Sequence, residues 1–281
     1  MNFDEKLDRV ITLALAEDIG DGDHSSNCSI PEDAIGKMQL IAKEDGIIAG
    51  LEVARKVFKK TNESSQLKEF MKDGDSIKKG DIIFDLWGPK RALLQGERVA
   101  LNLMQRMSGI ATKTNQLASL VSSTPVKLLD TRKTTPNLRF LEKQAVVLGG
   151  GHNHRMGLYD MIMLKDNHID FAGGIAPAVE KAQNYLAKNH LNIPIEVETR
   201  NLDELTQVMG CSGIQRVMFD NYTVEETYKA VQLVNGKIET ESSGGITEET
   251  ILAYAQTGVE FISVGALTHS VKSLDMSLIV C

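Results

Sequence analysis

The residues that could do chemistry recur in the second half of the chain, each group directly after a short apolar run. The runs lie near six positions: Leu128, Met163, Ile195, Met218, Ile238 and Ile262. The groups that follow them are Asp130-Thr131-Arg132-Lys133, Lys165-Asp166-Asn167-His168, Glu196-Val197-Glu198, Asp220-Asn221, Ser242-Ser243-Gly244-Gly245 and Val264-Gly265-Ala266. One charged strand end is ordinary, because every strand leaves the core somewhere. Six in succession predict a shared polar site, as at the mouth of a barrel of parallel strands.

Cations dominate one part of this predicted mouth. They are Arg132, Lys133, Arg155 and Lys165, accompanied by His152 and His154. The guanidinium fork of arginine binds planar carboxylates and phosphates, whereas lysine supplies a mobile point charge. The combination predicts a ligand that carries both carboxylate and phosphate groups. The sequence supplies no third partner for the two histidines, so metal binding by this pair is not expected.

Acidic residues and glycines complete the predicted mouth. Glu198 and Asp220 end neighbouring strands, where they could hold ribose hydroxyls or Mg²⁺ delivered with a polyphosphate. Gly244-Gly245 and Gly265-Ala266 end the last two strands and would let backbone N–H groups approach a phosphate. Glycine pairs also occur simply because a turn needs a positive φ. Two pairs at the last two strands favour the phosphate site.

The elements that must position these residues follow from the apolar pattern. Strands at intervals of roughly 20 to 35 residues, each followed by helix-forming sequence, predict parallel βαβ units. The first half predicts a helix from Asp4 to Asp18, followed by an antiparallel sheet with helices, whose strands are expected at Lys37 to Ala42, Gly46 to Ala49 and Asp81 to Leu86. A helix from Arg91 to about Val121 is expected to bridge two domains, with a break at Ser108-Gly109.

Composition excludes several classes of protein. The 281 residues are 42% apolar and 25% charged, which is typical of a folded globular chain. A net charge of -7 argues against nucleic-acid and anionic-membrane binding. The cysteines Cys28, Cys211 and Cys281 form no CxxC pair, so free thiols in a reducing cytoplasm are expected. Neither a secretory leader nor a membrane-spanning run is recognisable.

Taken together, these strings resemble the quinolinate phosphoribosyltransferase family over nearly the whole chain. The matching motifs of the first half are Glu97-Arg98, Leu101-Asn102 and Ser108-Gly109-Ile110-Ala111-Thr112. Those of the second half are Asp130-Thr131-Arg132-Lys133-Thr134, Gly149-Gly150-Gly151-His152-Asn153-His154-Arg155, Lys165-Asp166-Asn167-His168, Glu196-Val197-Glu198, Ser242-Ser243-Gly244-Gly245 and Val264-Gly265-Ala266-Leu267-Thr268-His269-Ser270.

The resemblance implies an α/β fold of two domains. An N-terminal α/β sandwich would comprise residues 1–112, with the tail 271–281 returning to it. An open, TIM-like α/β barrel would comprise residues 113–270. The family also implies a homodimer in which Arg98 reaches the partner's site. Whether such dimers assemble further into a hexamer, as a trimer of dimers, stays open.

The activity implied by the resemblance is transfer of the phosphoribosyl group of phosphoribosyl pyrophosphate to quinolinate. Decarboxylation would accompany the transfer and give nicotinate mononucleotide, pyrophosphate and CO2, a step of de novo NAD biosynthesis. The implied catalytic residues are Lys133, Lys165, Glu198 and Asp220. Glu198 and Asp220 would also hold Mg²⁺, directly or through water. The implied substrate-binding residues are Arg98, Thr131, Arg132, Lys133, His154, Arg155, Lys165, Glu198, Asp220, Ser243, Gly244, Gly245, Val264, Gly265 and Ala266.

Two other interpretations remain at this stage. A nicotinate phosphoribosyltransferase or a related paralogue would keep the barrel and the phosphate site without decarboxylating, although the crowded cations favour a dicarboxylate. A catalytically silent metabolite-binding barrel is the alternative from a different class, because a fold alone does not fix a function.

Overall fold

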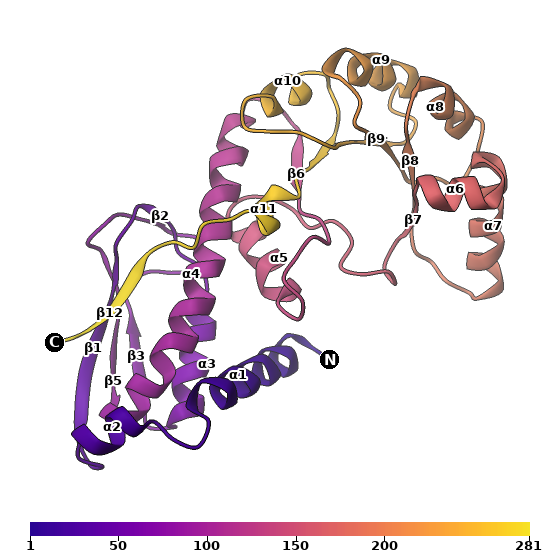
Figure 1. Ribbon diagram of the computed structural model, residues 1–281. Coiled ribbons are helices and arrows are strands. Elements are labelled where there is room, and N and C mark those ends of the chain that lie inside the picture. Colours follow the sequence, from indigo (N-terminus) through magenta and orange to yellow (C-terminus); the bar gives the residue numbers. More distant parts are fainter. The chain divides into compact units, whose positions relative to one another are not determined.

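The computed structural model describes all residues from Met1 to Cys281, which form two compact units (Figure 1). The first unit contains residues 1–115, 134–150 and 267–281, and the second contains residues 116–133 and 151–266. No helix in either unit combines the length and the apolar composition that crossing a bilayer requires.

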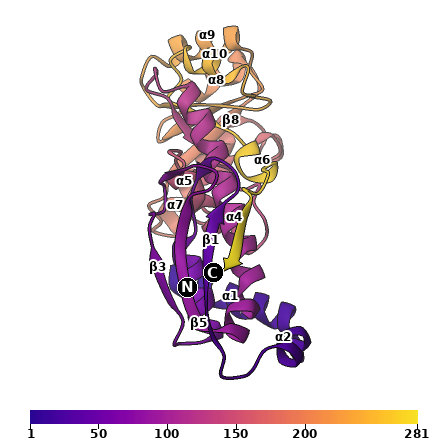
Figure 2. The ribbon, with the colours of Figure 1, turned by 90° about the vertical axis from the view of Figure 1, so that its left-hand side faces the viewer.

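The first unit is built on an antiparallel sheet of four strands in the order β12-β1-β5-β3 (Figure 2). Its strands are β1 (Ile35–Ala42), β3 (Gln66–Glu69), β5 (Ile82–Pro89) and β12 (Met276–Val280). Alternate residues of β1 are buried, namely Met38, Leu40 and Ala42, as expected for a strand with one face on a core. A second, two-stranded sheet pairs β2 (Gly46–Ile47) with β4 (Ser76–Ile77).

The helices of this unit follow local sequence signals. α1 begins with a capping box, in which Asn2 and Glu5 each bond the other's backbone N–H. Its apolar residues recur every four positions and are buried. The unit's helices are α1 (Phe3–Ile19), α2 (His24–Ser29), α3 (Leu51–Thr61), α4 (Lys90–Leu120) and α5 (Arg139–Leu148).

Helix α4 is continuous, so the expected break at Ser108-Gly109 is wrong. The Ser108 hydroxyl accepts the Ala49 N–H at 2.9 Å and donates to the Ala49 carbonyl at 3.1 Å. A Cβ on Gly109 would lie 2.2 Å from the carbonyl oxygen of Lys272. The small residues therefore serve close packing of two chain segments against the helix and do not end it.

The second unit is an α/β structure around a parallel sheet of six strands in the order β6-β11-β10-β9-β8-β7. The end strands β6 and β7 leave the sheet open, and helices such as α8 and α9 lie outside the strands (Figure 1). The strands are β6 (Lys127–Leu129), β7 (Ile162–Leu164), β8 (Ile195–Thr199), β9 (Arg216–Asp220), β10 (Glu239–Ser243) and β11 (Phe261–Ser263). The helices are α6 (Asp166–Ala172), α7 (Ile175–Lys188), α8 (Leu202–Met209), α9 (Val224–Val234), α10 (Ile251–Ala255) and, at the boundary of the units, α11 (Ala266–His269).

This architecture confirms the predicted fold class, an N-terminal sheet domain followed by a parallel α/β domain. All six apolar runs are strands or adjoin one, as the βαβ rhythm predicts. Because the six strands are parallel, their carboxyl ends lie along one edge of the sheet.

Candidate active site

The predicted mouth residues of the second unit lie at or directly after the carboxyl ends of its six parallel strands, except His154 and Arg155, which follow the bridge at His152. Along the edge the strand order places Arg132 after β6, Gly265 after β11, Gly244 after β10, Asp220 at the end of β9 and Lys165 after β7. Glu198 is the next-to-last residue of β8. Arg98 belongs to the other unit, where it is exposed on α4.

A buried carboxylate anchors the segment that carries His154 and Arg155. His152 pairs with Leu129 as a parallel bridge beside β6, donating its N–H to the Leu128 carbonyl at 2.8 Å. Asp130 donates its N–H to the His152 carbonyl at 3.1 Å, and its Oδ1 accepts the N–H of His154 at 2.9 Å. Asp130 is fully buried. Its role in holding the cationic segment was not assigned from the sequence.

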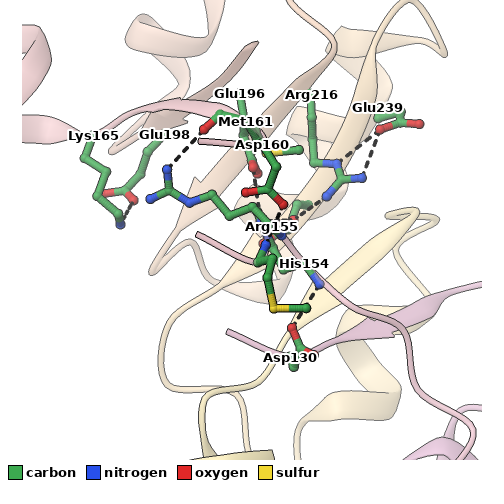
Figure 3. Close-up of polar contacts among 12 residues, drawn as sticks. Asp130, His154, Arg155, Asp160, Met161, Lys165, Glu196, Glu198, Arg216 and Glu239 are labelled. Carbon is green, nitrogen blue, oxygen red and sulfur yellow. Dashed lines mark hydrogen bonds and ion pairs between the residues drawn. The ribbon is translucent and has the colours of Figure 1, made fainter. Parts of the chain in front are cut away.

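Arg155 and Arg132 lie close enough to repel each other. Burial and the neighbouring charge of Arg132 together lower the pKa of the Arg155 guanidinium from its ordinary value. Arg155 donates to the Met161 carbonyl at 3.3 Å, and its side chain extends in the direction of the Lys165–Glu198 pair (Figure 3). Two guanidinium groups held together favour an anion between them.

Lys165 and Glu198 form an ion pair across β7 and β8 (Figure 3). The Glu198 carboxylate is nearly buried, whereas the Lys165 side chain is 44% exposed. The backbone N–H of Lys165 donates to His168 Nδ1 at 3.0 Å at the start of α6. An anionic ligand that bound the ammonium group would release the carboxylate to bind a cation or hydroxyls.

The glycine turn after β10 has the backbone that only glycine adopts readily. Gly244 and Gly245 have φ of 91° and 62°. At the end of β11, Val264 donates its N–H to the Leu129 carbonyl at 3.0 Å, which joins this strand end to β6. Thr131 Oγ1 in turn accepts the Lys133 N–H at 3.0 Å. The two small-residue turns and the cationic strand end therefore follow adjacent strands.

A charged cluster that sequence reasoning missed lies inside the barrel unit. His154 Nε2 lies 3.1 Å from Glu196 and 3.3 Å from Glu241, and Arg216 bonds Glu241 at 3.0 Å. Both glutamates are completely buried. The available signal was the strand period of two, because Glu196 precedes Glu198 by two residues and so shares its face of β8.

The cluster holds an additional proton. Burial would lower the pKa of His154, but hydrogen bonds and charges from Glu196 and Glu241 outweigh it and raise the pKa to about 9. Burial and the charge of Glu241 raise the pKa of Glu196 as well. The proton therefore belongs to the His154–Glu196 pair and not to one residue. Because Nδ1 accepts the Arg155 N–H at 2.6 Å, the ring carries its hydrogen on Nε2, and the additional proton lies on the Glu196 side of the pair.

The same three side chains have the residue types of a metal site. One ligand atom from each of His154, Glu196 and Glu241 lies within 4.8 Å of the others. Arg216 already neutralises one buried carboxylate, and the additional proton neutralises the other. Arg216 also bonds Glu239 at 3.0 Å, so its charge is shared between a buried and a partly exposed carboxylate.

Fold and site together define a class, namely open α/β-barrel proteins whose strand ends carry cations, carboxylates and a glycine turn. Residues 23–108 match the family model for the quinolinate phosphoribosyl transferase N-terminal domain, and residues 110–279 match that for its C-terminal domain. The chain therefore belongs to the quinolinate phosphoribosyltransferase family.

Individual relatives agree with this assignment. A probable nicotinate-nucleotide pyrophosphorylase (carboxylating) of Bacillus subtilis is 45% identical, and the alignment covers 97% of this chain and 93% of that protein. A mitochondrial quinolinate phosphoribosyltransferase (decarboxylating) of Nicotiana tabacum is 44% identical over 97% of this chain and 81% of its own length. The solved nicotinate-nucleotide pyrophosphorylase of Francisella tularensis superposes with a TM-score of 0.94 at 40% identity, covering 100% of this chain and 98% of that one.

Proposed function

We propose that this chain is a decarboxylating quinolinate phosphoribosyltransferase, a pentosyltransferase that makes nicotinate mononucleotide for NAD biosynthesis. Family membership over both domains supports the activity. The observation that carries the proposal is the pair of repelling guanidiniums, Arg132 and Arg155, at the sheet edge that also bears the Gly244 turn. An edge with these groups suits a ligand pair of a dicarboxylate and a sugar phosphate.

Quinolinate would bind at the cationic end of the edge. Arg132 and Arg155 clamp its two carboxylates, and Thr131, Lys133 and Lys165 complete the pocket. His154 is 7% exposed, and its ring nitrogens face Glu196, Glu241 and the Arg155 N–H. It therefore contributes chiefly by holding the backbone of Arg155. Arg98 would enter from a partner subunit, where its exposed position on α4 leaves it available.

Phosphoribosyl pyrophosphate would bind at the other end of the same edge. The ribose hydroxyls face Glu198 and Asp220. The 5′-phosphate lies on the two small-residue turns formed by Ser243, Gly244, Gly245, Val264, Gly265 and Ala266. The two carboxylates offer the hard oxygen ligands that suit Mg²⁺, and few protein ligands suffice for it. When bound, this ion would screen the charge of the pyrophosphate.

The reaction itself needs orientation and electrostatics more than acid–base catalysis. The quinolinate nitrogen attacks C1 of the ribose as pyrophosphate leaves, and the clamped carboxylates align that nitrogen. Lys133 and Lys165 stabilise the departing negative charge. When the bond from C2 to the carboxylate breaks, its electron pair stays on C2, where the positive charge of the adjacent quaternary nitrogen stabilises it. Carbon dioxide leaves, and a proton from solvent replaces it at C2.

The deciding experiment is incubation of the purified protein with quinolinate, phosphoribosyl pyrophosphate and Mg²⁺. Nicotinate mononucleotide, pyrophosphate and CO2 should form in equal amounts. A parallel incubation with nicotinate in place of quinolinate tests for a nicotinate phosphoribosyltransferase. Such an enzyme would use nicotinate and release pyrophosphate without CO2. Binding of both substrates without any product would identify a silent binding protein.

Assembly, location and domain limits are further parts of the proposal. We expect a homodimer, with a hexameric trimer of dimers as the larger alternative, and light scattering of the purified protein distinguishes them. The three free cysteines support a reducing, cytoplasmic location. The domain limits 1–112 with 271–281, and 113–270, stay predictions. Pairing of β12 with β1 supports the return of the tail.

A further inference from the structure

We propose that Asn221 is a positioning residue that couples the carboxylate of Asp220 to the glycine turn at Gly244. The inference rests on the proposed function, because it assigns these two groups to one substrate, phosphoribosyl pyrophosphate. No role for Asn221 follows from the charge pattern of the mouth, since an amide adds neither cation nor carboxylate.

The backbone of Asn221 crosses from one strand end to the next. Asn221 follows the last residue of β9 and has a φ of 57°, in the left-handed region. Its N–H donates to the carbonyl of Ser243 at 2.8 Å, one residue beyond the register pair of Asp220 and Ser243. Asparagine tolerates this conformation better than other residues with a side chain, because its short amide bonds locally.

The side chain of Asn221 contacts both functional groups. Its Nδ2 donates to Asp220 Oδ2 at 2.8 Å. On its other side, a Cβ added to Gly244 would lie 2.2 Å from Asn221 Oδ1 and 2.9 Å from the Asn221 nitrogen. The amide therefore occupies the space beside the Gly244 Cα. This contact is a second reason why position 244 requires glycine, in addition to its φ of 91°.

The consequence concerns a single substrate. One ring and a short exocyclic arm join its ribose hydroxyls to its 5′-phosphate and so limit the separation between them. Binding both at once requires that the carboxylate of Asp220 and the N–H groups of the Gly244 turn keep a matching separation, and small misplacements are costly. The Asn221 amide lies between these two groups and sets their relation. Quinolinate, which we assign to Arg132 and Arg155, does not depend on it.

The test replaces Asn221 by glycine, which keeps the left-handed backbone available and removes the amide. Asn235 provides the matched control, because it is exposed, has a φ of 48° and ends α9 away from the strand ends. For Asn221→Gly we expect the KM for phosphoribosyl pyrophosphate to rise about tenfold, the equivalent of one lost hydrogen bond. The KM for quinolinate should change less than about twofold. Asn235→Gly should leave both constants unchanged.

A second variant tests whether the effect of Asn221→Gly comes from misfolding. Asn221→Asp keeps the size of the side chain but sets a second carboxylate against Asp220, so it should raise the same KM at least as much. Thermal unfolding of all three variants checks the fold. Two results with an active wild type would overturn this inference and leave the proposed function intact. One is an equal rise in the KM for phosphoribosyl pyrophosphate and the KM for quinolinate. The other is no rise in the KM for phosphoribosyl pyrophosphate in either Asn221 variant. A wild type without transferase activity would overturn the proposed function and this inference with it.

Discussion

The buried pair of His154 and Glu196 predicts how the stability of the protein depends on pH. The pair retains an additional proton in the folded state up to about pH 9, whereas a free histidine releases it near 6.5. Because the folded state binds more protons in this window, the stability gained is fully present below pH 6.5. It is lost as the pH rises through about 9.

The magnitude follows from the size of the shift. Raising the pKa of His154 from 6.5 to about 9 corresponds to at most about 3 kcal/mol, since each pKa unit is worth about 1.4 kcal/mol. His154 is only 7% exposed, so screening by solvent reduces this value little. A loss of this size would be a large fraction of the stability of an ordinary domain.

The assay is urea unfolding at several pH values between 6.5 and 9.5 on the wild type and two variants. The double variant His154→Gln with Glu196→Gln removes both groups that share the proton. His152→Gln is the control, because His152 stands two residues away and is exposed. Over this range the wild type and His152→Gln should lose about 3 kcal/mol more than the double variant of His154 and Glu196. The same pH dependence in all three proteins would refute the reasoning about the cluster.

Three further outcomes are expected. Mixing inactive Arg98→Ala and Lys165→Ala subunits under exchange conditions should restore about a quarter of wild-type activity, because half of the dimers would hold one intact site; no recovery would contradict the shared site. Arg155→Ala should raise the KM for quinolinate about 100-fold, with Arg155→Lys recovering part of it in steady-state assays. Gly109→Ala should destabilise the first unit by about 1 to 3 kcal/mol in calorimetry, because its Cβ meets the Lys272 carbonyl.

Much of the second unit could be predicted from sequence because its strands are short, apolar and closed by polar residues. This pattern locates Asp220 and Gly244 at strand ends without knowledge of any contact. The resemblance to a known family added the substrates. Neither source predicts the pairing of the segment around His152 with β6, since a single isolated bridge has no period to detect.

The features that were not predicted correctly from the sequence also have physical causes. Ser108 and Gly109 suggest a helix end by propensity, but tertiary packing overrides propensity once another backbone approaches the helix. Glu196 and Glu241 look like ordinary polar strand residues until the barrel brings them to His154 from three separate chain segments. The strand period places Glu196 on the same face of β8 as Glu198, but its meeting with Glu241 and His154 depends on the topology of the sheet.

The short bridge between His152 and Leu129 also bears on solubility. Strand β6 ends the open sheet, and an unprotected end strand offers its backbone to any other extended chain. The segment that carries the cations covers part of that border. Deleting or shortening it would therefore do more than remove ligand-binding groups. It would uncover a template for intermolecular strand addition, so such a protein should tend to precipitate during expression.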